Sequence, residues 1–285
     1  MKVLITGALG LLGKVATQKL VDEGHDVTAI DRIDGDVPDG VQLHVGDIED
    51  LDFVRGAIRG AEAVVHLAAI PSPQPNREYE VFRNNVLGGF TVFNAAADAG
   101  CRIVAYASSL SAYGTAWSPK WTSPLYVPID ESHPLIYSES YALSKEVNEL
   151  TALEWSRRCD TAYVGFRFPN TNTPEGLLDF ARQINGGDPD LVQTDAKILW
   201  AYLDARDAAA ALELTIRSDL KGAHIFNIAA PDTNHLTPTA ELFAQFHPTT
   251  ELRGDFSGHQ SPVSSEHWLK TMGYAPKYFL DRSAL

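Results

Sequence analysis

A tyrosine and a lysine four residues apart are the first groups in this sequence whose types and spacing suggest joint chemistry. Tyr141 and Lys145 stand in the run YALSK, so on a helix both side chains project from one face. An ammonium beside a phenol favours the phenolate and lowers the tyrosine pKa from about 10. Such a tyrosine can take the proton of an alcohol while a hydride leaves, or return it in the reverse reaction. Ser109, close to the end of the preceding predicted strand, is suited to hydrogen-bond the same oxygen.

This spacing is common on helices, so the interpretation depends on a partner site that accepts the hydride. The first stretch, KVLITGALGLLGKV, combines an apolar run with glycines at 7, 10 and 13 and then a helical pattern over Lys14–Glu23. Gly7 allows a positive φ, Gly10 lets a pyrophosphate approach, and Gly13 lets the helix pack on the strand. A strand that turns on glycine into a helix offers backbone N–H groups to phosphate. The stretch therefore predicts a dinucleotide site, although an ordinary strand-to-helix turn can look the same.

The acidic residue at the end of the next predicted strand indicates which dinucleotide the site binds. Asp31 closes the predicted strand His25–Asp31, about 20 residues after the glycine turn, where a carboxylate accepts the ribose hydroxyls and repels a 2′-phosphate. This favours NAD over NADP. Arg32 keeps the alternative open, because a guanidinium can serve a 2′-phosphate.

Asp47 and Ile48 follow the third predicted strand, Val41–Val45, and are candidates to contact the adenine. The Asp47 carboxylate can accept from the adenine amino group, and Ile48 can cover the ring. The alternative role of Asp47 is to cap the predicted helix Leu51–Ile58.

The remaining elements continue to alternate between strand and helix. Ala63–Ala69 is a continuous apolar run, typical of a strand buried on both faces, and its small Ala68 and Ala69 can pass under a cofactor. His66 within it is expected to be a core histidine. The other predicted strands are Arg102–Ala107, Ala162–Phe168 and Ala223–Ile228, and the other predicted helices are Arg77–Ala99, Tyr141–Arg157, Leu203–Ile216 and Ser265–Met272. Residues 71–75 read as a loop, and residues 117–134 as an irregular excursion.

Alternation of this kind predicts an α/β fold with a doubly wound parallel sheet, that is, a Rossmann domain. We expect this domain to comprise residues 1–168 and 204–230. A small substrate-binding lobe is expected from residues 169–203 and 231–285.

Composition excludes several classes of function. The 285 residues carry a net charge of -14, which argues against a nucleic-acid surface. No apolar run approaches the roughly 20 residues of a membrane span, and no leader precedes the first strand, so we expect a cytoplasmic protein without a membrane partner. The two cysteines lie far apart, as in a reducing compartment, and the nine histidines show no paired metal-ligand spacing.

Eight short motifs resemble, in order, those of the extended short-chain dehydrogenase/reductases, also called the NAD-dependent epimerase/dehydratase family. They are TGALGLLG (6–13), Asp31, GDI (46–48), HLAA (66–69), NVLGG (85–89), SSLSAYG (108–114), YALSK (141–145) and RFPN (167–170). The resemblance implies a catalytic triad of Ser109, Tyr141 and Lys145, with Lys145 also holding the nicotinamide ribose. It further implies a homodimer through the helices at 77–99 and 141–157.

The motifs and the predicted strand ends together give the expected ligand contacts. The cofactor contacts are Gly7, Leu9, Gly10, Leu11, Leu12, Gly13, Asp31, Arg32, Asp47, Ile48, Leu67, Ala68, Ala69, Asn85, Ala107, Tyr141, Lys145, Phe168, Pro169 and Asn170. The substrate contacts are Ser72, Ser109, Leu110, Ser111, Asn170 and Lys197, with Arg182 as a second basic candidate. Lys197 lies where sugar-acid relatives place a base for a carboxylate, although a solvated surface lysine is the plainer interpretation.

The sequence departs from the family pattern most informatively in length. Relatives that act on nucleotide sugars carry a large lobe after the RFPN motif, whereas here only residues 171–203 separate that motif from the late Asp204–Asp207 motif. In outline the chain is similar to uronate and free-sugar dehydrogenases, which implies oxidation of a small sugar, sugar acid or polyol with NAD. Two alternatives remain, an NAD-dependent nucleotide-sugar 4-epimerase and a non-catalytic NAD(P)-binding sensor. A dehydratase is disfavoured because Leu110 and Ser111 stand where it would need acids.

Overall fold

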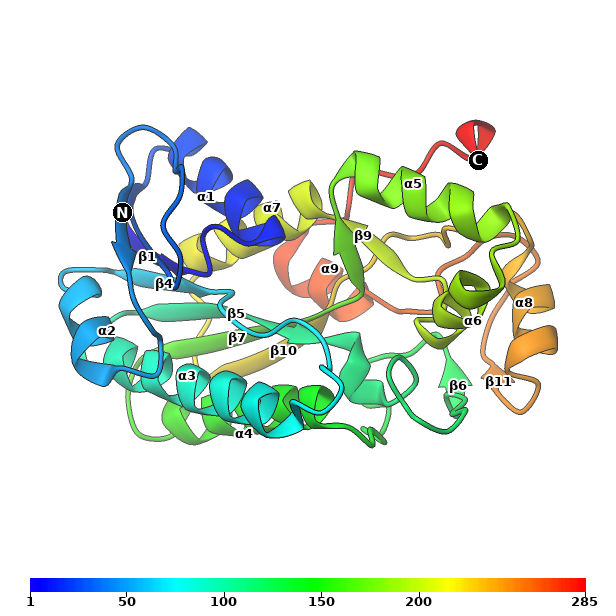
Figure 1. Cartoon of the computed structure of the whole chain (residues 1–285), viewed down its shortest axis with the longest axis horizontal. Coiled ribbons are helices and arrows are strands. Elements are labelled where there is room, and N and C mark those ends of the chain that lie inside the picture. Colours follow the sequence, from blue (N-terminus) through cyan, green and yellow to red (C-terminus); the bar gives the residue numbers. More distant parts are fainter.

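A computed structural model describes residues 1–285, and its main body is a seven-stranded, all-parallel sheet with the order β10-β7-β5-β4-β1-β2-β3 (Figure 1). The strands are β1 (Lys2–Thr6), β2 (Asp26–Asp31), β3 (Gln42–Val45), β4 (Ala63–His66), β5 (Ile103–Ser109), β7 (Ala162–Phe168) and β10 (Ala223–Asn227). The chain winds outward in both directions from β1 and β4, so the predicted doubly wound α/β fold is confirmed. In such sheets ligands bind outside the carboxyl ends of the strands, where the winding direction changes.

Helices cover both faces of this sheet (Figure 1). One layer is α1 (Leu11–Asp22) with α7 (Ala205–Arg217), and the other is α2 (Leu51–Ala57), α3 (Glu78–Asp98) and α4 (Ser140–Ser156). Alternate residues of a strand face opposite layers. Val3 and Ile5 therefore belong to one buried cluster, and Leu4 belongs to the other. A strand buried on both faces needs apolar residues at every position, which is why the sequence revealed the sheet.

A second, smaller part of the chain lies beyond the carboxyl ends of the strands. It contains α5 (Pro174–Asn185), α6 (Pro189–Lys197), α8 (Thr239–Phe246) and two short parallel pairs, β8 (Asn170–Asn172) with β9 (Tyr202–Asp204) and β6 (Tyr126–Val127) with β11 (Glu251–Leu252). Its core includes Tyr113, Trp200 and Phe243. None of these elements was predicted. The strands and α6 and α8 are short, whereas α5 has 12 residues and a capped, amphipathic pattern that was readable in the sequence.

The C-terminal helix returns to the sheet. Within α9 (Glu266–Met272), Trp268 is fully buried against Phe166 and Phe226 of β7 and β10. Part of the segment 231–285 thus packs on the Rossmann core. No helix of the structure has both the length and the apolar character that crossing a bilayer requires.

Two element ends differ from prediction in ways that matter for the site. α1 begins at Leu11, three residues earlier than expected, so the helix starts directly after Gly10. β5 runs on to Ser109, where a 3-10 turn (η1, Leu110–Tyr113) follows. Both changes bring a helical N-terminus and a serine to the same edge of the sheet.

Candidate active site

The glycine turn between β1 and α1 has the geometry that the sequence predicted. Gly7 has a φ of 73°, and a Cβ there would lie 2.7 Å from the Ala68 amide nitrogen. A Cβ at Gly13 would lie 1.9 Å from the Gly7 carbonyl oxygen, so only glycine lets α1 approach the turn. The helix is capped by Gly10, and no side chain accepts a hydrogen bond from its first turn. Its first N–H groups are therefore available to an anion.

A cavity of about 320 Å³ lies on the outer side of this turn, over the ends of β1, β2 and β3. The Asp31 carboxylate lines it and accepts hydrogen bonds from the amides of Leu9 (2.9 Å) and Arg32 (2.8 Å). The Arg32 guanidinium donates to Asp47 (3.3 Å) and to the Asn84 amide oxygen (3.2 Å). Asp31 is thus fixed beside the turn, and the cation of Arg32 already has partners.

A larger cavity, of about 530 Å³, lies on the inner side and shares Gly7, Gly10, Leu67 and Ala69 with the smaller one. It extends from the glycine turn past the ends of β5 and β7 to α5 and α6. The predicted residues that line it are Gly7, Gly10, Leu11, Leu12, Gly13, Leu67, Ala69, Ala107, Ser109, Leu110, Ser111, Tyr141, Lys145, Phe168, Pro169 and Asn170. Leu9, Asp31, Arg32, Asp47, Ile48 and Ala68 line the smaller cavity.

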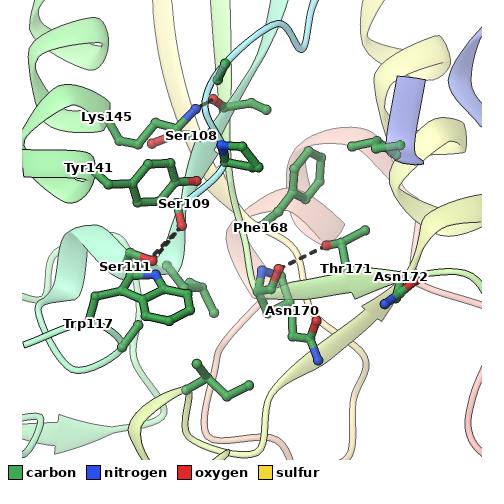
Figure 2. A pocket seen from close by; sticks show the side chains of 18 of the residues that line it. Ser108, Ser109, Ser111, Trp117, Tyr141, Lys145, Phe168, Asn170, Thr171 and Asn172 are labelled. Atoms are coloured by element: carbon green, nitrogen blue, oxygen red, sulfur yellow. Dashed lines mark hydrogen bonds between the residues drawn. The ribbon is translucent and has the colours of Figure 1, made fainter. Parts of the chain in front are cut away.

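Ser109, Tyr141 and Lys145 come together in the larger cavity (Figure 2). Tyr141 and Lys145 project from α4, and the Lys145 ammonium donates to the Ala107 carbonyl (2.9 Å) while lying 5.4 Å from the centre of the Tyr141 ring. The Tyr141 hydroxyl points toward Ser109, and Phe168, Asn170 and Thr171 lie across the cavity. A substrate hydroxyl between these groups would meet the phenol and the serine together.

Burial dominates the acid–base properties of this group. It raises the pKa of Tyr141 to about 12, against the lowering effect of a hydrogen bond with Ser109. It also lowers the pKa of Lys145 to about 8, although the negative charge of Glu149 acts in the opposite direction. The prediction that the lysine lowers the tyrosine pKa therefore does not hold for the protein alone, because burial disfavours the phenolate and Lys145 is not among the groups that shift this pKa.

A buried network behind the triad was not predicted, although Ser108, Tyr113 and Arg167 lie in recognised motifs; its central residue, Glu149, lies outside them. The Glu149 carboxylate accepts hydrogen bonds from Ser108 (2.5 Å) and from two nitrogens of Arg167 (2.9 and 2.6 Å). Arg167 also donates to the Tyr113 hydroxyl (2.8 Å). The network ties α4 to the ends of β5 and β7. It also engages the Ser108 hydroxyl, which leaves Ser109 as the serine beside Tyr141.

Several predicted contacts lie outside both cavities. Asn85 is buried behind the loop after β4, where its amide binds both backbone groups of Ile70 and donates to Ser144 (3.1 Å). The Lys197 ammonium donates to the Ser118 carbonyl (3.2 Å), Arg182 donates to the Ala284 carbonyl (2.9 Å), and Ser72 accepts from Gln74 (3.0 Å). None of these four predicted contacts lines either of the two cavities.

His66 is a core histidine, as expected. Its ring nitrogen pairs with the Thr6 hydroxyl (2.7 Å), and burial, followed by the nearby charge of Lys145, lowers its pKa to about 3.

Other residues line the larger cavity without having been singled out. They are Pro71, Ser108, Tyr113, Thr115, Ala116, Trp117, Ile129, Thr171, Asn172, Phe180, Thr194, Ile198 and Leu199. Most come from the irregular segment after β5 and from the small lobe, where neither period nor motif marks which side chains face inward.

Comparison with known proteins places this site in a family. Residues 3–229 match the profile of the NAD dependent epimerase/dehydratase family. The chain is 25% identical to a UDP-glucose 4-epimerase of Corynebacterium glutamicum over 98% of its own length and 92% of the relative's. It is 28% identical to an NAD-dependent glucose-6-phosphate dehydrogenase of Haloferax volcanii over 82% and 87% of the two chains.

A solved structure shares the fold over the whole chain. It is a short-chain dehydrogenase/reductase superfamily protein from Agrobacterium tumefaciens with bound NAD, with a TM-score of 0.76, 23% identity and coverage of 100% and 95%. The family profile spans most of this chain, including the glycine turn and the triad. The chain belongs to the NAD dependent epimerase/dehydratase family.

Proposed function

We propose that this protein is an NAD-dependent dehydrogenase that oxidises a hydroxyl group of a small sugar, sugar acid or polyol. The observation that carries the proposal is the meeting of Ser109, Tyr141 and Lys145 in a cavity that continues into the glycine turn. A hydride acceptor and a proton acceptor are then both within reach of one substrate carbon.

The residues along the two cavities fit NAD. The open first turn of α1 suits the pyrophosphate, and the Asp31 carboxylate suits the hydroxyls of an unphosphorylated ribose. Arg32 pairs with Asp47 and Asn84, so it offers little to a 2′-phosphate, which supports NAD over NADP.

Each triad residue then has a separate task. Ser109 hydrogen-bonds the substrate oxygen, and Tyr141 removes its proton. Lys145 supplies a positive charge that favours the phenolate and donates to the nicotinamide ribose. The nicotinamide, when bound, accepts the hydride or returns it.

The second candidate is a nucleotide-sugar 4-epimerase, favoured by the similarity to the Corynebacterium enzyme along nearly the whole chain. Only residues 171–203 separate the RFPN motif from the Asp204–Asp207 motif, and so short a segment favours a substrate smaller than a nucleotide sugar. A non-catalytic sensor is the remote alternative, and the complete triad argues against it.

We also propose that the protein is a homodimer through α3 and α4. These helices pack side by side and carry exposed apolar side chains, Leu87 and Phe90 on α3 and Leu150 and Leu153 on α4. Apolar residues gathered on neighbouring helices are typical of an interface.

Nicotinamide absorbance tests the proposed reaction. Purified protein is mixed with NAD or NADP and with sugars, uronates, polyols and a nucleotide sugar, and the products are separated. Steady NADH formation with a small substrate supports the dehydrogenase. Conversion of the nucleotide sugar without net NADH would replace it by the epimerase.

A further inference from the structure

The larger cavity contains one charged side chain, that of Lys145. We infer that the substrate is an uncharged polyhydroxy compound, a neutral sugar or polyol, rather than a sugar acid, a sugar phosphate or a nucleotide sugar. This inference rests on the proposed dehydrogenase function and narrows its substrate class.

Lys145 itself is poorly placed to hold a substrate anion. Its side chain is almost fully buried at 4% exposure, and its ammonium already donates to the Ala107 carbonyl. Moreover, it lies beside the Tyr141 ring, so an anion paired with it would occupy the place of the reacting hydroxyl.

Three cations that lie near lining residues in the sequence do not line the cavity themselves and have other partners. Arg167, on β7, is in a buried pair with Glu149, and Lys197 and Arg182 donate to the carbonyls of Ser118 and Ala284. To reach a substrate, Arg167 would have to leave a buried carboxylate uncompensated.

The helix ends at the cavity also offer little to an anion. The first turn of α5 donates to its own cap, the Thr173 hydroxyl, whereas α6 contributes Thr194, in its C-terminal half, to the lining, so its N-terminus is not part of the cavity wall. The uncapped terminus is that of α1, which we assign to the cofactor. A carboxylate or phosphate bound beside α5 and α6 would therefore lose water without gaining a compensating charge.

The cavity is instead lined by neutral polar and apolar side chains, which suit a small molecule that carries several hydroxyl groups. Asn170 has a side-chain amide without a partner in the protein, so it can both donate and accept, and Ser111 lies across the cavity from it (Figure 2). Thr115 also lines the cavity. Apolar surface comes from Trp117, Phe180 and Leu199. Apolar walls with a few convergent neutral polar groups are typical of sites for small neutral ligands.

Matched compounds test the inference directly. An aldohexose, its 6-carboxylate and its 6-phosphate share a ring and differ in charge. We expect kcat/KM with NAD for the neutral sugar to exceed that of either anion by roughly 100-fold, because a site without a cation leaves the buried anion unpaired. Calorimetric binding to NAD-loaded Tyr141→Phe protein gives the same comparison without turnover.

A pair of substitutions on α6 adds a charge inside or outside the cavity. Thr194 lines the cavity, whereas its neighbour Gln193 is exposed and does not. Thr194→Arg should raise the ratio of anion to neutral-sugar binding by about tenfold, since a guanidinium pairs well with carboxylate or phosphate. Gln193→Arg adds the same charge outside the cavity and should leave the ratio unchanged.

The outcomes separate this inference from the function on which it rests. NADH formation from the carboxylate or phosphate at least as fast as from the neutral sugar would overturn the inference and leave the dehydrogenase standing. Absence of NADH from every compound would overturn the dehydrogenase. Calorimetry would then still show whether neutral or anionic sugars bind more tightly. Tighter binding of the anions, or no binding of any neutral sugar or polyol in a panel, would count against an uncharged substrate.

Discussion

The Lys145 ammonium lies 5.4 Å from the centre of the Tyr141 ring, one helical turn along α4, and both side chains are buried. The lysine is held by the end of β5 through the Ala107 carbonyl, so the helix and the strand fix its position jointly. Because burial penalises a charge on either group, the protein alone keeps the phenol protonated.

Removal of the Tyr141 hydroxyl should abolish most turnover and leave cofactor binding intact. We expect Tyr141→Phe to lower kcat by about 1,000-fold, within the range for loss of a general base, with NAD affinity changed less than about threefold. Stopped-assay rates and NAD titration measure the two quantities. Tyr278→Phe is the matched control, because Tyr278 is partly exposed and does not line the cavity. Full activity of Tyr141→Phe would remove the tyrosine from the proposed mechanism.

The rate of alcohol oxidation should rise with pH, and less steeply above about pH 8. With the pKa of Tyr141 at about 12, the phenolate fraction grows about tenfold per pH unit through the neutral range. The charge of Lys145 supports the phenolate and is lost near its pKa of about 8, so the rise should weaken above that pH. In Lys145→Met the rate should be lower and show no break near pH 8. A pH profile of kcat/KM for both proteins tests this, and a flat wild-type profile would contradict it.

Replacement of Asp31 should weaken the preference for NAD. Its carboxylate is fixed by the amides of Leu9 and Arg32 at the wall of the smaller cavity. Asp31→Ser removes an acceptor for ribose hydroxyls and a charge that repels a 2′-phosphate, so kcat/KM for NAD should fall by about 10- to 100-fold while that for NADP rises. Asp36→Ser removes the same charge from an exposed position nearby and should change neither value. Equal effects of the two substitutions would leave Asp31 without a specific role.

The sequence predicted the parts of this molecule whose signals are local. The strands around β1 and β4 are buried on both faces, so their apolar runs stand out, and Tyr141 and Lys145 lie on one helix, where spacing alone brings them together. The glycine turn is equally local, because its constraints at Gly7 and Gly13 arise within one strand–turn–helix unit.

The wall of the cavity opposite the triad was not predictable in the same way. Thr194 and Ile198 line it while Lys197, next to Ile198 on the chain, turns away to the Ser118 carbonyl. The direction of α6 over the cavity decides which of these residues faces inward, and that direction depends on packing around Trp200 and Phe243, far apart in the sequence. The start of α5 had a readable signal, since Thr173 caps it and Pro174 begins it.

A charge on the exposed face of α4 should separate the proposed dimer. Leu150 is 57% exposed, near Leu153 and the exposed residues of α3. Leu150→Asp would bury a carboxylate at the interface, so light scattering should report a monomer where the wild-type protein is a dimer. Leu269→Asp changes an equally apolar exposed residue on α9 and should leave the mass unchanged. A monomeric wild-type protein would rule out this interface.

His66 should make the protein less stable in mild acid. The ring pairs with Thr6 in the core and its pKa is about 3, whereas in the unfolded chain it titrates near 6.5. Between these values the unfolded state binds a proton that the folded state does not, so the free energy of unfolding falls as pH decreases below 6.5. The expected contribution is about 1.4 kcal/mol per pH unit once the pH is well below 6.5.

His66→Gln isolates this contribution, because glutamine does not titrate. Urea unfolding at pH 7.5, 6.5 and 5.5 should find the variant less stable than wild type at pH 7.5, since packing and part of the Thr6 contact are lost. The difference should then shrink by about 1.4 kcal/mol between pH 7.5 and pH 5.5. His44→Gln, on the edge strand β3, provides a comparison at a histidine outside the core. A difference between wild type and His66→Gln that stays constant over this range would mean that His66 takes up its proton equally in the folded and unfolded chains.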